Sequence, residues 1–253
     1  PEKKSKVMSD RAKKLTAYHE GGHAVVSEFL EHTDPVHYIT IIPRGPSGGA
    51  TYFRPKEDLE NFHSYSELFE NIVVSLGGRV SEKLFLDDIS TGASGDIQQA
   101  THTARNMVTV YGMSDRLGPI SFDSSGHSIF IGRDFGQTKS YSEETAAIID
   151  EEVKHIFDEA SAKAESILTE HADILKGIAE YLLANESMDG EDFSYFCRHG
   201  EMPPKKPEPK MRDSSIEPPA RKISYTFDEP KETPQIDSGE TQTQDEPKDE
   251  TKE

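Results

Sequence analysis

The stretch TAYHEGGHAVVSEFL, residues 16–30, combines a strong helical pattern with an unusual choice of residues. Its apolar residues recur at helical spacing, which predicts a helix over 16–31. Yet Gly21 and Gly22 stand side by side in the interior of that helix. Each glycine costs about 1 kcal/mol there relative to alanine, so both need a structural reason.

Two histidines, His19 and His23, lie four residues apart in this stretch. Residues at that spacing share one face of a helix, so the two imidazoles can hold one tetrahedral Zn²⁺ ion. Glu20, offset by about 100° around the helix axis, can take a proton from a zinc-bound water and pass it to a leaving amine. The apolar face places the motif partly inside a core, where unpaired histidines would be costly. The alternative is a helix with two surface histidines.

A third zinc ligand has to come from another part of the chain. In the extended pattern H-E-x-x-H-x-x-G-x-x-H the eighth and eleventh residues are glycine and histidine, but here they are Val26 and Phe29, which excludes that class. Spacing does not choose among the remaining candidates, which are Glu70, Glu82, Asp87, Asp88, Asp96 and His102. Asp96 also has a structural explanation, because an acid in the first turn of a helix favours the helix dipole and the free amides.

The rest of the pattern predicts a mainly α-helical fold with a small β portion, in the α+β class. Residues 36–42 and 50–53 are rich in β-branched and aromatic residues, which predicts a strand pair. Residues 118–132 have the pattern of a hairpin. Helical spacing predicts further helices at 66–86, 96–111, 142–185 with a break near 171–173, and 190–198.

Composition divides the chain into two parts. Nine of the 15 prolines fall in 201–253, which has few large apolar residues. We therefore predict a disordered acidic tail there and one folded domain over 1–200. Without the tail's nine basic and 14 acidic residues, the net charge of −19 becomes about −14 for the folded part. Such a charge argues against a nucleic-acid partner.

Cysteine content and hydropathy restrict the setting of the protein. The single cysteine, Cys197, excludes an internal disulfide framework and fits a reducing compartment. No run of 18 apolar residues and no signal peptide are present in this sequence.

Seven blocks, in order over about residues 1–198, resemble the protease domain of the FtsH family of ATP-dependent, membrane-anchored zinc proteases. The blocks are TAYHEGGHA (16–24), DPVHYITIIPRG (34–45), LGGRVSEKLF (76–85), TGASGDIQQAT (91–101), ARNMVTVYGMSDRLGPI (104–120), IFIGRD (129–134) and MDGEDF (188–193). The resemblance implies that His19, His23 and Asp96 bind one zinc ion per chain and that Glu20 is the general base.

One residue departs from the family pattern, which usually has alanine where this chain has Gly21. We interpret Gly21 as drift that leaves metal binding intact, and Gly22 as a point of close contact with another element. In proteases of this kind an extended peptide commonly adds to a sheet edge beside the zinc, and glycines let another backbone approach. The candidate substrate-binding residues are Gly48, Gly49, Ala50 and Thr51, although a plain structural hairpin has the same pattern.

The resemblance also implies a larger assembly. The family couples the peptidase to an AAA-type ATPase module and works as a homo-hexamer on unfolded proteins or peptides. No G-x-x-x-x-G-K-[ST] phosphate loop occurs here, so ATP is expected to act only through a module absent from this chain. Membrane attachment is likewise expected only through an absent N-terminal part. We therefore expect a fragment that is soluble by itself, the cytoplasm-facing domain of a membrane-anchored bacterial protein.

Two other functions stay open at this point. One is a zinc hydrolase that acts on small peptides or amides, and the other is a non-catalytic adaptor that retains the protease fold. The intact His19, Glu20 and His23 argue against the adaptor, because a decayed site usually loses the glutamate first.

Overall fold

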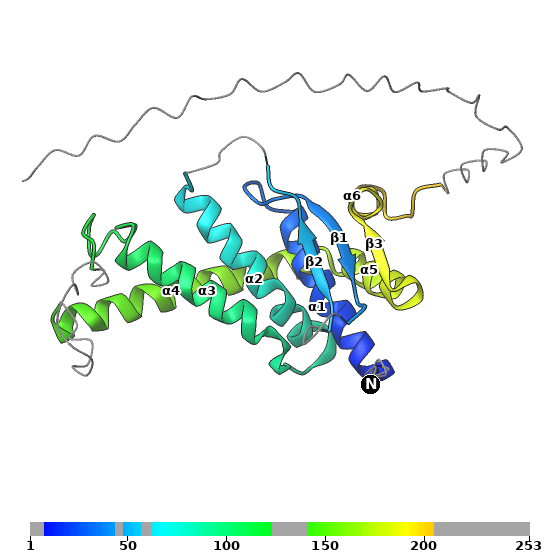
Figure 1. The fold of residues 1–253 in the computed structure, drawn as a ribbon, viewed down its shortest axis with the longest axis horizontal. Helices are drawn as coiled ribbons and strands as arrows, with labels where there is room; N and C mark the ends of the chain where they lie inside the picture. The colour runs from blue at the N-terminus through cyan, green and yellow to red at the C-terminus, as the bar shows by residue number, and fades with distance from the viewer. Residues whose placement is uncertain (1–7, 44–47, 57–61, 123–140, 205–253) are drawn as a thin grey trace, which may run out of the picture. The chain divides into compact units, whose positions relative to one another are not determined.

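The computed structural model describes residues 8–43, 48–56, 62–122 and 141–204 of the chain. It confirms the predicted mainly helical α+β fold, in which a small antiparallel sheet packs against the helices (Figure 1). The elements in chain order are α1 (Asp10–Glu28), β1 (Val36–Thr40), β2 (Ala50–Phe53), α2 (Tyr65–Leu86), the 3₁₀ turn η1 (Thr91–Ala93), α3 (Ser94–Thr109), α4 (Glu143–Glu170), α5 (Ala172–Asn185), β3 (Ser187–Asp189) and α6 (Gly190–His199).

Helix α1 is the central element of the domain. Its start is fixed by Ser9, whose side-chain oxygen accepts a hydrogen bond from the backbone N–H of Ala12 at 3.3 Å, and by Asp10 in the first turn. Nearly every residue between Thr16 and Ser27 is buried, because α2, α5 and β1 all contact the helix. The metal-binding pattern therefore lies within the core, as the apolar face of the sequence predicts.

Helices α1 and α2 meet at a pair of glycines. A Cβ atom on Gly22 would lie 2.5 Å from the carbonyl oxygen of Gly77, and one on Gly77 would lie 2.8 Å from that of Gly22. The close contact predicted at Gly22 is thus confirmed. At Gly21 the nearest neighbour of an added Cβ is Leu175 Cδ1, at 2.9 Å. That atom ends a flexible side chain, so it can move.

The sheet has three strands in the order β2-β1-β3, with both neighbouring pairs antiparallel. Ile39 of β1 pairs with Thr51 of β2 on one side and with Met188 of β3 on the other. The sequence predicted β1 and β2 but not β3, because a three-residue strand is too short to show alternation. In Figure 1, β2 forms the edge of the sheet on the side of α2 and α3.

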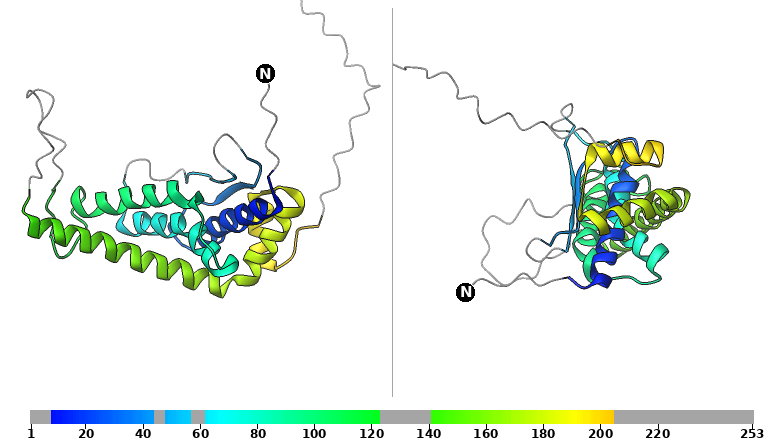
Figure 2. Two further views of the ribbon diagram at one scale, coloured as in Figure 1. Left: turned by 90° about the horizontal axis from the view of Figure 1, so that it is seen from below. Right: turned by 90° about the vertical axis from the view of Figure 1, so that its right-hand side faces the viewer.

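The helical pattern predicted over 142–185 is two helices. Helix α4 ends and α5 begins at His171, whose ring stacks on Phe29 with a centroid distance of 3.5 Å. Helix α4 runs along α2 and α3 and contacts both (Figure 2). Its buried residues include Ile149 and Ile156. Its apolar stripe therefore packs inside the domain.

Two sequence predictions fall outside the described residues. The hairpin expected at 118–132 has only residues 118–122 described, and these form no strand. The tail expected at 201–253 is described only as far as residue 204, so the division of the chain at residue 200 stays a prediction. None of the helices in the described ranges combines the length and the hydropathy needed to cross a bilayer.

The two glycines of α1 should respond oppositely to alanine. Gly22→Ala should lower the free energy of unfolding by roughly 1–3 kcal/mol, because its methyl group meets the α2 backbone. Gly21→Ala should leave it unchanged or raise it by up to about 1 kcal/mol through helix propensity. Urea unfolding of both variants tests this, and equal effects at the two positions would contradict it.

Candidate metal centre

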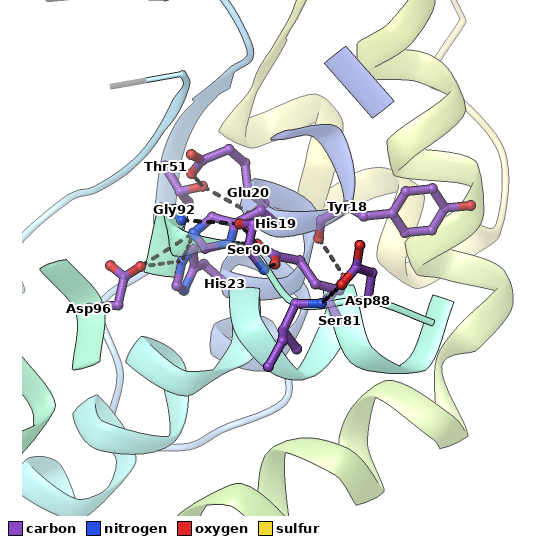
Figure 3. A network of polar contacts seen from close by, with 12 residues as sticks. Tyr18, His19, Glu20, His23, Thr51, Ser81, Asp88, Ser90, Gly92 and Asp96 are labelled. Atoms are coloured by element: carbon purple, nitrogen blue, oxygen red, sulfur yellow. Dashed lines mark hydrogen bonds and ion pairs between the residues drawn. The ribbon is translucent and has the colours of Figure 1, made fainter. Parts of the chain in front are cut away.

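Three side chains from two helices converge at one point. His19 and His23 project from α1 with their Nε2 atoms 3.1 Å apart, and Asp96 reaches them from the first turn of α3. Its Oδ2 lies 3.3 Å from His19 Nε2 and 3.7 Å from His23 Nε2 (Figure 3). Within the described part of the chain, these residues form the one His, Asp and Glu cluster with metal-ligand spacing.

Helix α2 fixes the orientation of both imidazole rings. His19 Nδ1 lies 2.6 Å from the carboxylate oxygen Oε1 of Glu82, and His23 Nδ1 lies 2.7 Å from the backbone carbonyl of Val74. Both partners are acceptors, so each Nδ1 donates a hydrogen and each Nε2 keeps a lone pair for a metal ion. Gly78 allows α2 to approach the two imidazole rings, because a Cβ there would lie 2.6 Å from His23 Nε2.

Glu82 is itself held by the loop that follows α2. The backbone N–H of Ser90 donates to Glu82 Oε2 at 2.6 Å, and its hydroxyl donates to Oε1 at 3.1 Å. The sequence named Glu82 as a possible third ligand, but the structure places it on the opposite ring nitrogen of His19. There it orients the ring of His19. The spacing of Val74, Gly78 and Glu82, four residues apart on one helix face, is the signal that could have indicated this.

The other candidates for the third ligand lie elsewhere. Glu70 pairs with His32 at 3.0 Å, and Asp88 pairs with Arg11 at 3.4 Å on the surface. His102 is exposed and contacts Asn106 on its own helix. Asp87 adopts a left-handed conformation at the end of α2.

Burial and hydrogen bonding shift the pKa values of the two imidazoles in opposite directions. Burial disfavours charge on either ring, but hydrogen bonds to Asp96 and Glu82 raise the pKa of His19 to about 9. Burial and the neighbouring His19 lower the pKa of His23 to about 4. Although burial opposes it, hydrogen bonding to His19 lowers the pKa of both Asp96 and Glu82. The cluster thus attracts one positive charge.

The donor set fits zinc. The Nε2 atoms of His19 and His23 and one carboxylate oxygen of Asp96 lie within 4.8 Å of one another. A tetrahedral catalytic zinc site uses three such protein ligands and leaves one position open. The hydrogen bonds at both Nδ1 atoms are the outer contacts that zinc-binding histidines generally make.

Glu20 lies beside the three ligands and points toward β2. Its carboxylate Oε2 accepts a hydrogen bond at 2.9 Å from the hydroxyl of Thr51, which also lies 3.1 Å from the Glu20 backbone carbonyl (Figure 3). Glu20 is 8% exposed, and burial raises its pKa, while the charge of His19 and the Thr51 bond oppose the rise. A carboxylate with a raised pKa is suited to accept and return a proton near neutral pH.

The ligands open into a cleft of about 780 Å³. Its lining includes His19, His23 and Asp96, together with the segment 48–51 that the sequence indicated as a substrate strand. The structure therefore brings all the predicted site residues to one cleft. Packing within the domain also explains the glycine at position 49, since a Cβ there would lie 2.6 Å from the carbonyl oxygen of Thr40.

A helix that supplies two histidines and an adjacent glutamate to one cleft is the arrangement of a zinc metallopeptidase. The sequence profile of Peptidase family M41 matches residues 6–196. This chain belongs to peptidase family M41.

Relatives of the chain carry FtsH names. It is 54% identical over 193 residues to ATP-dependent zinc metalloprotease FtsH 1 of Thermoanaerobacter sp. (strain X514), covering 76% of this chain and 31% of that protein. It is 45% identical over 204 residues to ATP-dependent zinc metalloprotease FtsH of Bacillus subtilis (strain 168), covering 80% and 32%. The chain spans about a third of the length of these relatives. The resemblance to the FtsH protease domain is confirmed.

Loss of the Glu82 charge should weaken zinc binding. Glu82→Gln should reduce zinc affinity about 10–100-fold, the usual effect of losing an outer partner of a histidine ligand. Asp96→Ala should lose stoichiometric zinc. Competition with a chromophoric chelator measures both affinities, and Glu70→Gln on the same helix serves as control. Zinc affinity unchanged in Glu82→Gln would contradict the orienting role.

Proposed function

We propose that this chain is a zinc endopeptidase domain that cleaves peptide bonds in extended or unfolded polypeptides. His19, His23 and Asp96 hold the zinc ion, and Glu20 is the general base. The observation that carries this proposal is the convergence of two Nε2 lone pairs and one carboxylate oxygen in a cleft, with a buried glutamate next to them.

Each group has a definite part in hydrolysis. When bound, a zinc ion polarises the scissile carbonyl and lowers the pKa of water at the site. The Glu20 carboxylate takes a proton from the attacking water and returns it to the leaving amine. Thr51 holds that carboxylate in place, since its hydroxyl can donate to Oε2 at 2.9 Å.

In the described part of the chain, the outer edge of β2 pairs with no other strand and offers a place for the substrate backbone. β2 pairs with β1 along one edge and lies at the end of the strand order. Its first residues and the preceding glycines, 48–51, line the cleft beside Glu20. An extended peptide that adds to this edge would be bound through its main chain, which suits a protease that accepts many sequences.

The names of the relatives support a wider setting for the domain. They are described as ATP-dependent zinc metalloproteases. By the family resemblance, the domain acts in a homo-hexamer with an AAA-type ATPase module that unfolds and delivers protein substrates. We further propose, from the same resemblance, that it lies on the cytoplasmic side of a bacterial membrane protein.

Removal of the base should separate catalysis from metal binding. Glu20→Gln should lower kcat for an unfolded substrate such as casein by about 10²–10⁴-fold, the usual contribution of a general base, with zinc content unchanged. A zinc chelator should abolish cleavage by the unmodified chain. Glu31→Gln, an exposed acid just after α1, is the control.

The same assay separates the competing functions. Full activity in Glu20→Gln would refute the assigned base. A chain that binds zinc but cleaves nothing would be the non-catalytic adaptor, and cleavage limited to dipeptides would indicate the small-peptide hydrolase.

Thr51 should affect turnover more than substrate binding. Thr51→Val keeps the shape of the side chain but removes the hydroxyl that contacts Glu20. A hydrogen bond to a charged group contributes about 1.5–3 kcal/mol, so kcat should fall by about tenfold or more with little change in KM. Thr51→Ser should restore turnover. Steady-state kinetics on one peptide gives both constants, and a rise in KM alone would contradict the positioning role.

A further inference from the structure

A second cavity, of about 370 Å³, adjoins the metal cleft at the end of β2. Phe53, Val74 and Ser75 line both spaces. The carbonyl of Val74 also accepts the hydrogen bond from His23 Nδ1. Val74 therefore both lines the second cavity, called here the Phe53 cavity, and contacts the proposed zinc ligand His23.

The lining of the Phe53 cavity suits a large uncharged group. Leu68 and Val74 of α2 join Phe53 in an apolar wall, and the amides of Asn71 and Gln99 add polar groups from α2 and α3. Its volume exceeds ten times the about 30 Å³ that a water molecule occupies in the liquid. An aromatic or long aliphatic side chain with apolar contacts on one side and hydrogen-bonding amides on the other matches this surface.

One acidic side chain among the described residues lines the cavity, and it is already engaged. Asp34 Oδ1 accepts a hydrogen bond from the backbone N–H of Lys56 at 3.1 Å. The backbone carbonyl of Asp34 in turn accepts from the hydroxyl of Ser27 at 3.0 Å. These bonds engage one carboxylate oxygen and the backbone carbonyl of Asp34 within the protein, and His63 is the other titratable side chain among the described lining residues.

The direction of strand β2 indicates on which side of the scissile bond the cavity lies. Thr51 contacts the general base, and Phe53 lies two residues further along, on the same face and about 7 Å away by strand geometry. Both strand pairs in the sheet are antiparallel. A peptide that pairs with β2 in antiparallel direction runs opposite to the strand. Its residue opposite Phe53 therefore lies two positions N-terminal to its residue opposite Thr51. Opposed residues point to the same face of a sheet.

We propose that the Phe53 cavity is a specificity subsite, which takes a bulky uncharged side chain of the substrate on the N-terminal side of the cleaved bond. The subsite rests on the proposed endopeptidase function. It adds side-chain selectivity to a binding mode that otherwise depends on the peptide backbone.

The test compares peptides that differ at one residue. Each series carries Phe, Leu, Gly or Asp at one of the positions flanking the cleaved bond, and mass spectrometry of the products gives kcat/KM and the cleavage site. The zinc-loaded chain should prefer Phe or Leu over Gly by about tenfold or more, as a filled apolar pocket allows. The preference should occur at one position N-terminal to the bond.

Two variants fill the cavity from different walls. Thr103→Phe on α3 and Asn71→Phe on α2 should each bring kcat/KM for the Phe and Leu peptides down to the value for the Gly peptide. Gln98→Phe, on α3 but outside the lining, is the matched control and should keep the preference. Zinc content and melting temperature establish that each variant is folded, and the exposed Asn71 keeps the test available if Thr103→Phe does not fold.

The outcomes separate the subsite from the function. Cleavage without any preference, a preference on the C-terminal side, or a preference that survives in both filled variants would overturn the subsite alone. If the zinc-loaded chain cleaved no peptide at all, the endopeptidase function and the subsite would both be overturned.

Discussion

The close contact between α1 and α2 at Gly22 and Gly77 is the constraint on which the metal centre depends. With no side chains between them, the two backbones approach so closely that the carbonyl of Val74 reaches His23 and the carboxylate of Glu82 reaches His19. Those bonds fix the protonation of each ring and turn the Nε2 atoms toward Asp96. The helix-destabilising glycines are therefore part of the metal centre, although they touch no metal.

The close contact between α1 and α2 also helps to stabilise a buried polar cluster. His19, Glu20 and His23 are each less than a tenth exposed, yet every buried side-chain nitrogen and oxygen in the described residues has a hydrogen-bond partner. Unpaired polar groups at that depth would destabilise the fold by about 1–3 kcal/mol each. Because the partners come from α2, β2 and the loop before α3, the centre forms only when those elements have assembled around α1.

Local patterns predicted much of this structure, and contacts between distant segments account for what they missed. The break near His171 and the helical spacing give the helices, since periodicity is a property of neighbouring residues. The pair of histidines was likewise visible in one helix. Asp96 could be chosen only by family resemblance, because it comes from another helix. β3 and the orienting role of Glu82 went unrecognised, since each is defined by a partner more than 60 residues away.

Ser90 links the end of α2 to the turn that leads into α3. It holds both oxygens of Glu82, and its hydroxyl also accepts a hydrogen bond from Gly92 N–H at 3.1 Å, in the turn that leads into α3 and Asp96. A local unfolding of this loop would release the carboxylate that orients His19 and displace the third ligand in the same motion. For the zinc site proposed above, metal dissociation and loop opening would be thermodynamically linked, so that occupancy of the site would govern how often the segment between α2 and α3 exchanges its amide hydrogens with solvent.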